Sequence, residues 1–199
     1  MSQEHKVIIA PGLGGDVKQI QLVTKDWPEK YGLQSIVIPI AWKDGEHFVP
    51  KLRRITDLID QLAEKGDQIS LIGCSAGGSA MLNAFVERKK LIYRVVNNGG
   101  FLRPGKRKGF RSFEQRTASS PAFKESILRF AEVEPTLTPA YRAKILTVRP
   151  LWDELVPPET VEIPGAINAT VPMVEHVLGL ATALVKYDPV IMFLKGEKN

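Results

Sequence analysis

A short turn flanked by glycines constrains the fold of this chain more than any other stretch. The sequence G-C-S-A-G at residues 73–77 lies between the apolar run 69–72 and a helical pattern over 80–86. Glycines two residues before and after Ser75 let the neighbouring backbone pass without a Cβ clash. A turn this tight forces the serine into a strained backbone conformation and lifts its Oγ clear of the preceding strand. The stretch therefore predicts a strand, a sharp turn carrying an exposed serine, and a helix.

The rest of the chain alternates between short apolar runs and helical patterns. Predicted strands cover 7–10, 35–40, 69–73, 92–97, 144–148 and 166–171, and predicted helices cover 17–31 with an interruption near Pro28, about 50–65, and a C-terminal segment from about 178 that is disturbed at 188–189. Apolar strands that alternate with helices are typical of a mostly parallel sheet covered on both faces. The predicted fold class is α/β with a central sheet of about six strands, whose ligands bind at the carboxyl ends of the strands.

The length of 199 residues predicts one domain over 1–199. The connection 99–140 between two predicted strands is too long for a simple turn. It contains a basic cluster and a helical pattern with Ala122, Ile127 and Phe130. We interpret it as a small, cap-like insertion packed over the carboxyl edge of the sheet.

A serine nucleophile needs a base, and the chain has three histidines. His5 precedes the first predicted strand, at the amino end of the sheet. His47 follows the second predicted strand, near the start of a helix. His176 follows the last predicted strand, and of the three it best fits a base over the carboxyl edge beside Ser75. The alternative for His176 is an ordinary surface or core histidine.

An acid is needed to orient the base and to stabilise its protonated form. Asp153 follows the fifth predicted strand by a few residues, and Glu154 is a neighbouring rival. An aspartate in such a turn is by itself more often a helix cap or a turn former. The chain order Ser75, Asp153, His176 places each group after a strand, and the three assignments support one another.

A transition state with an oxyanion also needs hydrogen-bond donors. The backbone N–H of Ala76 is one candidate, and the N–H of Leu13 in the glycine-rich loop 11–15 is the second. The glycines of this loop, including Gly12, let backbone approach a substrate. The alternative is a phosphate-cradling or plain connecting turn, but the loop lacks the full G-x-G-x-x-G spacing and the G-K-[ST] of a P-loop.

Together these motifs make the chain resemble the α/β-hydrolase superfamily over nearly its whole length. The matching motifs are 12–15, 73–77, 153–157 and 176–179, and the chain resembles the small, minimal serine esterases and lipases and the compact hydrolases of unassigned function. The resemblance implies a Ser75–His176–Asp153 triad, an acyl-enzyme route, and no metal or other cofactor. The chain departs from the family in having Pro11-Gly12 where many members have His-Gly. The first two strands of the full eight-stranded family sheet are also missing.

We therefore predict a serine hydrolase that cleaves carboxylic esters. A thioesterase or an amide hydrolase with the same triad is one alternative. A catalytically silent, hydrolase-like binding protein whose basic insertion docks a partner is another. The sequence leaves the oligomeric state open.

The net charge of +5 resides in one segment, because residues 103–116 carry six basic residues and one acidic residue, Glu114. The segment is interpreted as a solvated loop, as a rim that attracts an anionic acyl substrate, or as a contact for an acidic membrane surface or nucleic acid. Nucleic acid is weakly supported, because only Phe110 and Phe113 interleave with the charges. Gly12, Phe101, Phe110 and Phe113 are the candidate substrate-binding residues, although the phenylalanines could equally anchor the insertion.

Cys74 is the single cysteine, so an internal disulfide and a cysteine-type zinc site are excluded. Its position in the turn predicts a packed structural residue rather than an alternative nucleophile. The first residues lack a signal-peptide pattern, and no apolar stretch approaches the roughly 18–20 residues needed to span a bilayer. A cytoplasmic protein without stable membrane insertion is the default expectation.

Overall fold

The computed structural model describes residues 3–15, 17–172, 174–185 and 188–197. Its strands form one parallel sheet in the order β2-β1-β3-β4-β5-β6. The strands are β1 (His5–Ala10), β2 (Leu33–Val37), β3 (Gln68–Cys74), β4 (Ile92–Asn98), β5 (Ile145–Pro150) and β6 (Ile167–Val171). The α/β class and the six-stranded parallel sheet predicted from the sequence are confirmed.

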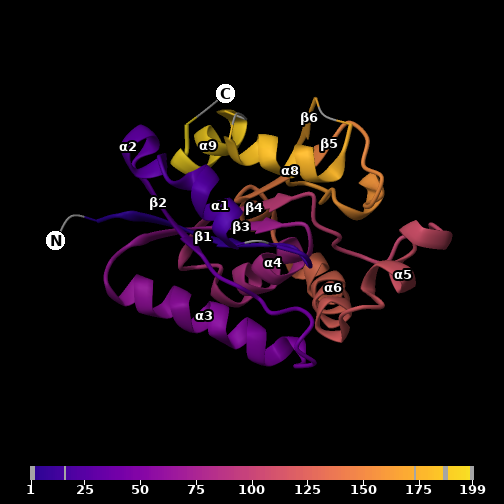
Figure 1. The fold of residues 1–199 in the computed structure, drawn as a ribbon. Helices are drawn as coiled ribbons and strands as arrows, with labels where there is room; N and C mark the ends of the chain where they lie inside the picture. The colour runs from indigo at the N-terminus through magenta and orange to yellow at the C-terminus, as the bar shows by residue number, and fades with distance from the viewer. Residues whose placement is uncertain (1–2, 16, 173, 186–187, 198–199) are drawn as a thin grey trace.

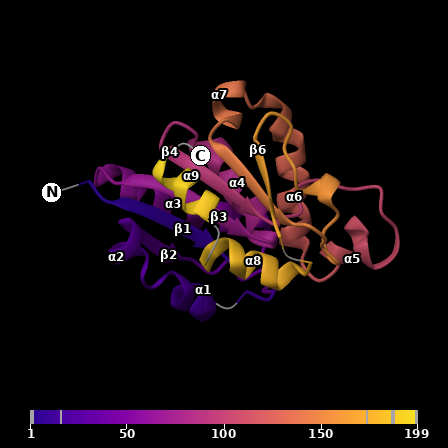
Figure 2. The same ribbon diagram turned by 90° about the horizontal axis from the view of Figure 1, so that it is seen from above.

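Helices cover both faces of the sheet (Figures 1 and 2). On one face lie α1 (Val17–Thr24), α2 (Trp27–Tyr31), α8 (His176–Val185) and α9 (Asp188–Lys195), and on the other lie α3 (Phe48–Glu64), α4 (Ala76–Arg88) and α6 (Pro121–Val133). Successive β1 side chains alternate between the faces, since Val7 and Ile9 join one apolar cluster and Ile8 joins the other. No helix in the described ranges is long and apolar enough to span a bilayer.

The parallel register brings the ends of three strands to the same level. Ala10 of β1 pairs with Gly73 of β3, and Cys74 pairs with Asn98 of β4. The chain runs from β1 to β2 on one side and continues from β3 to β4 on the other. Such a reversal of strand order opens a crevice at the carboxyl ends. Ser75 and the loop 11–15 leave the sheet at this point.

Several element boundaries differ from the sequence prediction, and three of these differences concern a proline or the candidate site. The second strand ends at Val37, before Pro39, which cannot donate a ladder hydrogen bond. The helix expected over 17–31 is two helices, and Pro28 lies in the first turn of α2, where its missing N–H costs nothing. Helix α8 begins at His176 itself, not at about 178.

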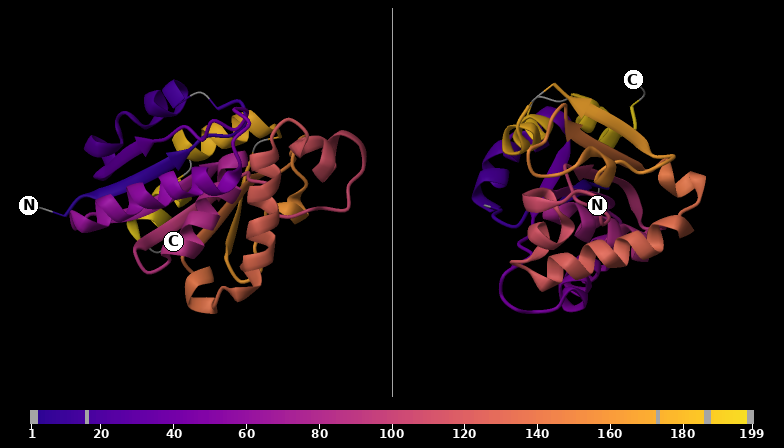
Figure 3. Two further views of the ribbon diagram at one scale, coloured as in Figure 1. Left: turned by 90° about the horizontal axis from the view of Figure 1, so that it is seen from below. Right: turned by 90° about the vertical axis from the view of Figure 1, so that its right-hand side faces the viewer.

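The segment 99–140 has two parts. Residues 99–117 include the short helices η1 (Gly109–Arg111) and α5 (Phe113–Thr117), and extend past the carboxyl ends of the strands (Figure 3). Helix α6 instead packs against α3 and α4 and buries Phe123, Ile127 and Phe130. Only the first part therefore lies where a cap-like insertion is expected. The assignment of a single domain over 1–199 stays a prediction.

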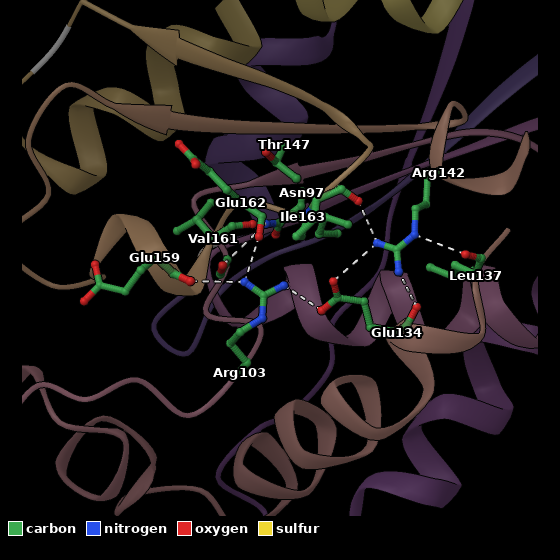
Figure 4. Close-up of polar contacts among 12 residues, drawn as sticks. Asn97, Arg103, Glu134, Leu137, Arg142, Thr147, Glu159, Val161, Glu162 and Ile163 are labelled. Carbon is green, nitrogen blue, oxygen red and sulfur yellow. Dashed lines mark hydrogen bonds and ion pairs between the residues drawn. The ribbon is translucent and has the colours of Figure 1, made fainter. Parts of the chain in front are cut away.

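A buried carboxylate fixes the segment that follows α6 (Figure 4). Glu134, in η2 (Glu134–Thr136), lies between two guanidinium groups, with Arg103 Nη2 at 2.6 Å and Arg142 Nη1 at 3.4 Å. Arg103 also donates to the carbonyls of Glu159 and Glu162, at 3.1 and 2.7 Å. Removing either arginine would leave part of the buried charge uncompensated. The cluster joins the helix layer to the loop between β5 and β6.

The turn after β3 depends on close backbone contact at two glycines. A Cβ on Gly73 would lie 2.2 Å from the carbonyl oxygen of Gly77, and one on Gly77 would lie 2.3 Å from that of Ala10. Both distances are far below van der Waals contact, and the clashing atoms belong to the backbone. The glycines therefore allow α4 to begin directly against β1 and β3.

We predict that Gly73→Ala lowers the free energy of unfolding by about 3 kcal/mol, because the added methyl pushes α4 away from β3. Gly14→Ala is the matched control, since a Cβ there meets no described atom within 4 Å. Urea unfolding followed by circular dichroism measures both variants. Equal midpoints for the two variants would contradict the role assigned to Gly73.

Candidate active site

Ser75 occupies a strained position between β3 and α4. Its φ of 50° and ψ of −120° lie outside the usual regions, and Ala41 is the one other non-glycine described with positive φ. Two backbone hydrogen bonds hold it, from Ser75 N–H to the Asn98 carbonyl and from Gly78 N–H to the Ser75 carbonyl, each 2.9 Å. The conformation turns the serine side chain toward the loop after β1, where a Cβ on Gly12 would lie 3.3 Å from Oγ.

The structure brings His176 and Asp153 to Ser75. His176 Nε2 lies 3.1 Å from Ser75 Oγ, and His176 Nδ1 lies 2.7 Å from Asp153 Oδ2. The histidine and the aspartate are each only 3% exposed. With Nδ1–H donating to the carboxylate, Nε2 is left to accept the serine proton. The three residues are thus a hydrogen-bonded chain with the geometry that nucleophilic catalysis requires. Their catalytic roles stay predictions.

The two neighbouring carboxylates make different contacts. Asp153 Oδ1 accepts from the backbone N–H groups of Leu155 and Val156, both at 2.8 Å, which leaves Oδ2 for the histidine ring. Glu154 Oε2 instead accepts from the backbone N–H of His176 at 3.0 Å. An acceptor there stabilises the start of α8, where the first N–H groups have no partner within the helix. Asp153 therefore binds the imidazole ring of His176, whereas Glu154 binds the backbone N–H of the same residue.

The other two histidines make separate contacts. His5 lies in β1 and is bonded through Nε2 to Ser70 Oγ at 2.8 Å, and burial lowers its pKa. His47 precedes α3 and pairs through Nδ1 with Glu125 at 2.6 Å. Over the described part of the chain, no three His, Cys, Asp or Glu side chains lie in position to share a metal ion.

The candidate oxyanion donors lie on either side of the serine. The loop after β1 closes into a turn through a 3.0 Å hydrogen bond from Gly15 N–H to the Gly12 carbonyl, and Leu13 lies inside this turn. Ala76 is the first residue of α4, so its N–H has no carbonyl four residues earlier within the helix. Both residues border the same turn as Ser75. Their role as donors stays a prediction.

A cavity of about 370 Å³ opens over Ser75 and His176. Its walls come from the loop after β1, from α1 and α8, and from single residues of α5 and the acid-bearing loop. The side chains and loop residues that line it are Pro11, Gly12, Leu13, Gly14, Gly15, Gln19, Ile20, Val23, Cys74, Ser75, Arg116, Leu155, His176, Leu180, Ala181 and Leu184. Most of these side chains are apolar, as is usual for a small-molecule pocket.

Of the candidate substrate-binding residues, Gly12 lines this cavity and the three phenylalanines do not. Phe101 and Phe113 are buried against each other, with ring centroids 6.1 Å apart, and belong to the core cluster. Phe110 is 65% exposed. The interpretation that phenylalanines anchor the segment fits Phe101 and Phe113, because a buried aromatic pair stabilises a connection that has little regular structure.

Sequence reasoning missed the apolar wall of the cavity. Ile20 and Val23 on α1, and Leu180 and Leu184 on α8, line it. Their spacings of three and four residues place each pair on one helix face. The signal that could have identified them is that each helix directly follows a site motif, the loop 11–15 or His176.

Cys74 is buried beside the serine and is one of the residues that line the cavity. Burial raises the pKa of its thiol to about 12, partly offset by the Asn98 amide, whose Nδ2 lies 3.9 Å from Sγ. A thiol with this pKa is almost entirely protonated at neutral pH, so it is a poor nucleophile. The structure supports the expectation of a packed, structural cysteine.

No model of a known protein family matches the chain, and no curated protein matches it. Solved structures do. One, from a study of the metagenome-derived lipolytic enzymes LipS and LipT, is 15% identical, with 99% of this chain and 96% of that chain covered and a TM-score of 0.69. A lipase-esterase related protein from Clostridium acetobutylicum is 13% identical, with 99% of this chain and 96% of that chain covered and a TM-score of 0.65. An α/β-hydrolase superfamily protein from Enterococcus faecalis is 16% identical, with 99% of this chain and 92% of that chain covered and a TM-score of 0.61. This chain therefore has the α/β-hydrolase fold.

We predict that Cys74 reacts with a thiol reagent such as iodoacetamide at least about 100-fold more slowly in the folded protein than in urea at pH 8, because its raised pKa leaves little thiolate. Mass spectrometry of timed samples measures the rate. Because the pKa is raised, the folded-state rate should keep rising with pH up to about 12. Rapid labelling of the folded protein at pH 8 would contradict this assignment.

Proposed function

We propose that this protein is a serine hydrolase that cleaves carboxylic esters through an acyl-enzyme intermediate. The observation that carries the proposal is the unbroken hydrogen-bonded chain from Ser75 through His176 to Asp153 at the floor of an apolar cavity. The fold adds support, because solved structures that share it include lipolytic and lipase-esterase related proteins.

In the first half of the proposed reaction, Ser75 Oγ attacks the ester carbonyl carbon while His176 Nε2 takes the hydroxyl proton. The carbonyl oxygen becomes an oxyanion that accepts hydrogen bonds from the N–H groups of Leu13 and Ala76. Asp153 stabilises the protonated imidazole and keeps Nε2 aimed at the serine. The C–O bond to the alcohol then breaks, His176 returns the proton to the leaving oxygen, and the acyl group remains on Ser75.

In the second half, water takes the place of the alcohol. His176 Nε2 removes one proton from the water as its oxygen attacks the acyl carbon. The tetrahedral intermediate collapses, the Ser75–acyl bond breaks, and the proton returns to Ser75 Oγ. The products are the free carboxylic acid and the original enzyme. No step needs a metal or another cofactor.

The cavity supports a small-molecule substrate with an apolar part. Its apolar side chains come from both faces of the sheet, and its volume of about 370 Å³ suits a small ester. A thioester or an amide would use the same residues, so these remain alternatives, as does a silent binding protein. A cytoplasmic location also stays a prediction.

We predict that a fluorophosphonate probe labels the wild-type protein and not Ser75→Ala, because the probe traps a serine that a neighbouring base activates. His176→Ala should reduce the labelling rate strongly while leaving Ser75 in place. Gel fluorescence and intact mass measure the adduct. A folded wild-type protein that resists the probe would favour the silent binding protein.

We also predict that Asp153→Asn lowers kcat for p-nitrophenyl butyrate about 10³- to 10⁴-fold, because an amide holds the imidazole in the wrong tautomer. Glu154→Gln is the matched control and should cost less than about tenfold, acting mainly through a weaker start of α8 worth about 1 kcal/mol. Steady-state kinetics and thermal unfolding separate the two effects. A larger kinetic loss in Glu154→Gln would reverse the assignment of the acid.

A further inference from the structure

The basic segment 103–116 is not a single surface, because its arginines make different contacts. Arg103 is engaged with Glu134, and Arg107 pairs with Glu159 at 3.0 Å. Arg111 Nη2 donates to the backbone carbonyl of Asp153 at 2.8 Å. These three side chains therefore hold the segment to the rest of the fold and are not available as a common binding rim.

Arg116 differs from the other three in two respects. Among the described residues its side chain makes no ion pair or hydrogen bond, whereas the side chains of Arg103, Arg107 and Arg111 each make at least one. It also lines the cavity over Ser75, and it is the one permanently charged side chain among the described lining residues. No carboxylate lines the described cavity. A half-buried guanidinium that has no partner among the residues the structure describes favours an anionic group in a ligand, which it can bind through two parallel hydrogen bonds.

The helix that carries Arg116 is anchored on both sides of the residue. Ser112 begins α5 by accepting from Gln115 N–H at 3.2 Å, and Thr117 Oγ1 donates to the Phe113 carbonyl at 2.8 Å. Phe113 is buried against Phe101 in the core. Because the helix is fixed by the core, the start of the Arg116 side chain is positioned before any ligand arrives, which lowers the entropic cost of binding.

The cavity has walls of different origin on the two sides of Ser75. Ile20, Val23 and Leu184 pack with the apolar cluster on the face that α1 and α8 cover. Leu13, Leu155 and the helix of Arg116 pack against the cluster on the opposite face. Ser75 lies at the sheet edge between them. A substrate that extends to both sides of Ser75 would place an apolar group against α1 and α8, and an anionic group near Arg116 on α5.

We propose that Arg116 is a binding residue that selects esters with an apolar chain or ring on one side of the scissile bond and an anionic group, such as a carboxylate, on the other. The inference rests on the proposed ester hydrolysis at Ser75 and names its substrate class. The anion can belong to the acyl part or to the alcohol part, and the experiment includes one pair of esters for each case.

The kinetic test uses two pairs of esters that differ in one charge. The first pair is p-carboxyphenyl hexanoate and p-carbamoylphenyl hexanoate, with the anion in the leaving group. The second is mono-p-nitrophenyl adipate and p-nitrophenyl hexanoate, with the anion in the acyl group. The readout is the ratio of kcat/KM for the anionic ester to that for its neutral partner. The variants are Arg116→Gln, Arg116→Lys and the control Lys108→Gln, which removes an exposed charge outside the cavity.

In at least one pair, we expect Arg116→Gln to lower this ratio about 10- to 100-fold, as for a lost charge-assisted hydrogen bond. Arg116→Lys should lower it less, because the charge is kept and the planar fork is lost. Lys108→Gln should change it less than about threefold, because salt screens exposed charges. An unchanged ratio in both pairs for Arg116→Gln, or an equal fall for Lys108→Gln, would overturn the inference.

A binding measurement separates this inference from the proposed hydrolysis. Ser75→Ala is titrated with two uncleaved amide analogues, p-hexanamidobenzoate and the monoanilide of adipic acid, with and without Arg116→Gln. We expect the Arg116→Gln substitution, added to Ser75→Ala, to raise Kd for at least one analogue about tenfold or more. If no ester is cleaved but this dependence is found, the hydrolysis proposal fails and the anion site stands. If neutral esters are cleaved and neither Kd depends on Arg116, the inference alone fails.

Discussion

The approach of the β3–α4 turn to the loop after β1 is the contact on which the site depends. Gly77 allows backbone to meet backbone there, Gly73 lets the start of α4 lie against the end of β3, and Gly12 lies against the side chain of Ser75. Because the contact is between main-chain atoms, no side-chain rotamer can relax it. The serine is therefore presented at a fixed height above the sheet, and its positive φ of 50° is maintained by hydrogen bonds from both flanks. The parallel register of β1, β3 and β4 then determines which loops can reach it.

The acid and the base reach the serine on loops that are secured independently. Asp153 is fixed by two N–H groups of its own loop and by Arg111 at its carbonyl, while the far end of that loop is tied to Glu134 through Arg103. His176 is fixed at the start of a helix by Glu154. Buried polar networks of this kind favour one geometry because each unsatisfied group would cost free energy. The candidate triad is thus supported by contacts outside the three residues.

Local chemistry explains which features could be predicted from the sequence. The turn at Ser75 was predictable because the glycines that permit its close backbone contacts fall within five residues of sequence. The positions of Asp153 and His176 were predictable because each follows a predicted strand. The cavity wall was not predictable in the same way. Phe113 and Ile20 are both apolar, and only the packing of their helices decides that one is buried in the core while the other faces the cavity. The different surroundings of Arg116, which lines the cavity, and of Arg103 and Arg111, which bind distant parts of the chain, likewise depend on packing and not on local sequence.

One helix carries both the base and part of the substrate wall. His176, Leu180 and Leu184 all line the cavity, and they follow one another at intervals of four residues along α8. Each interval advances about 6 Å along the helix axis. The candidate base and two residues of the apolar cavity wall are therefore held at fixed spacings on a single helix. A bulkier side chain at Leu184 shortens the space for a chain at its far end, whereas one at Leu180 closes it a turn earlier, so chain-length selectivity can change in steps without moving the triad.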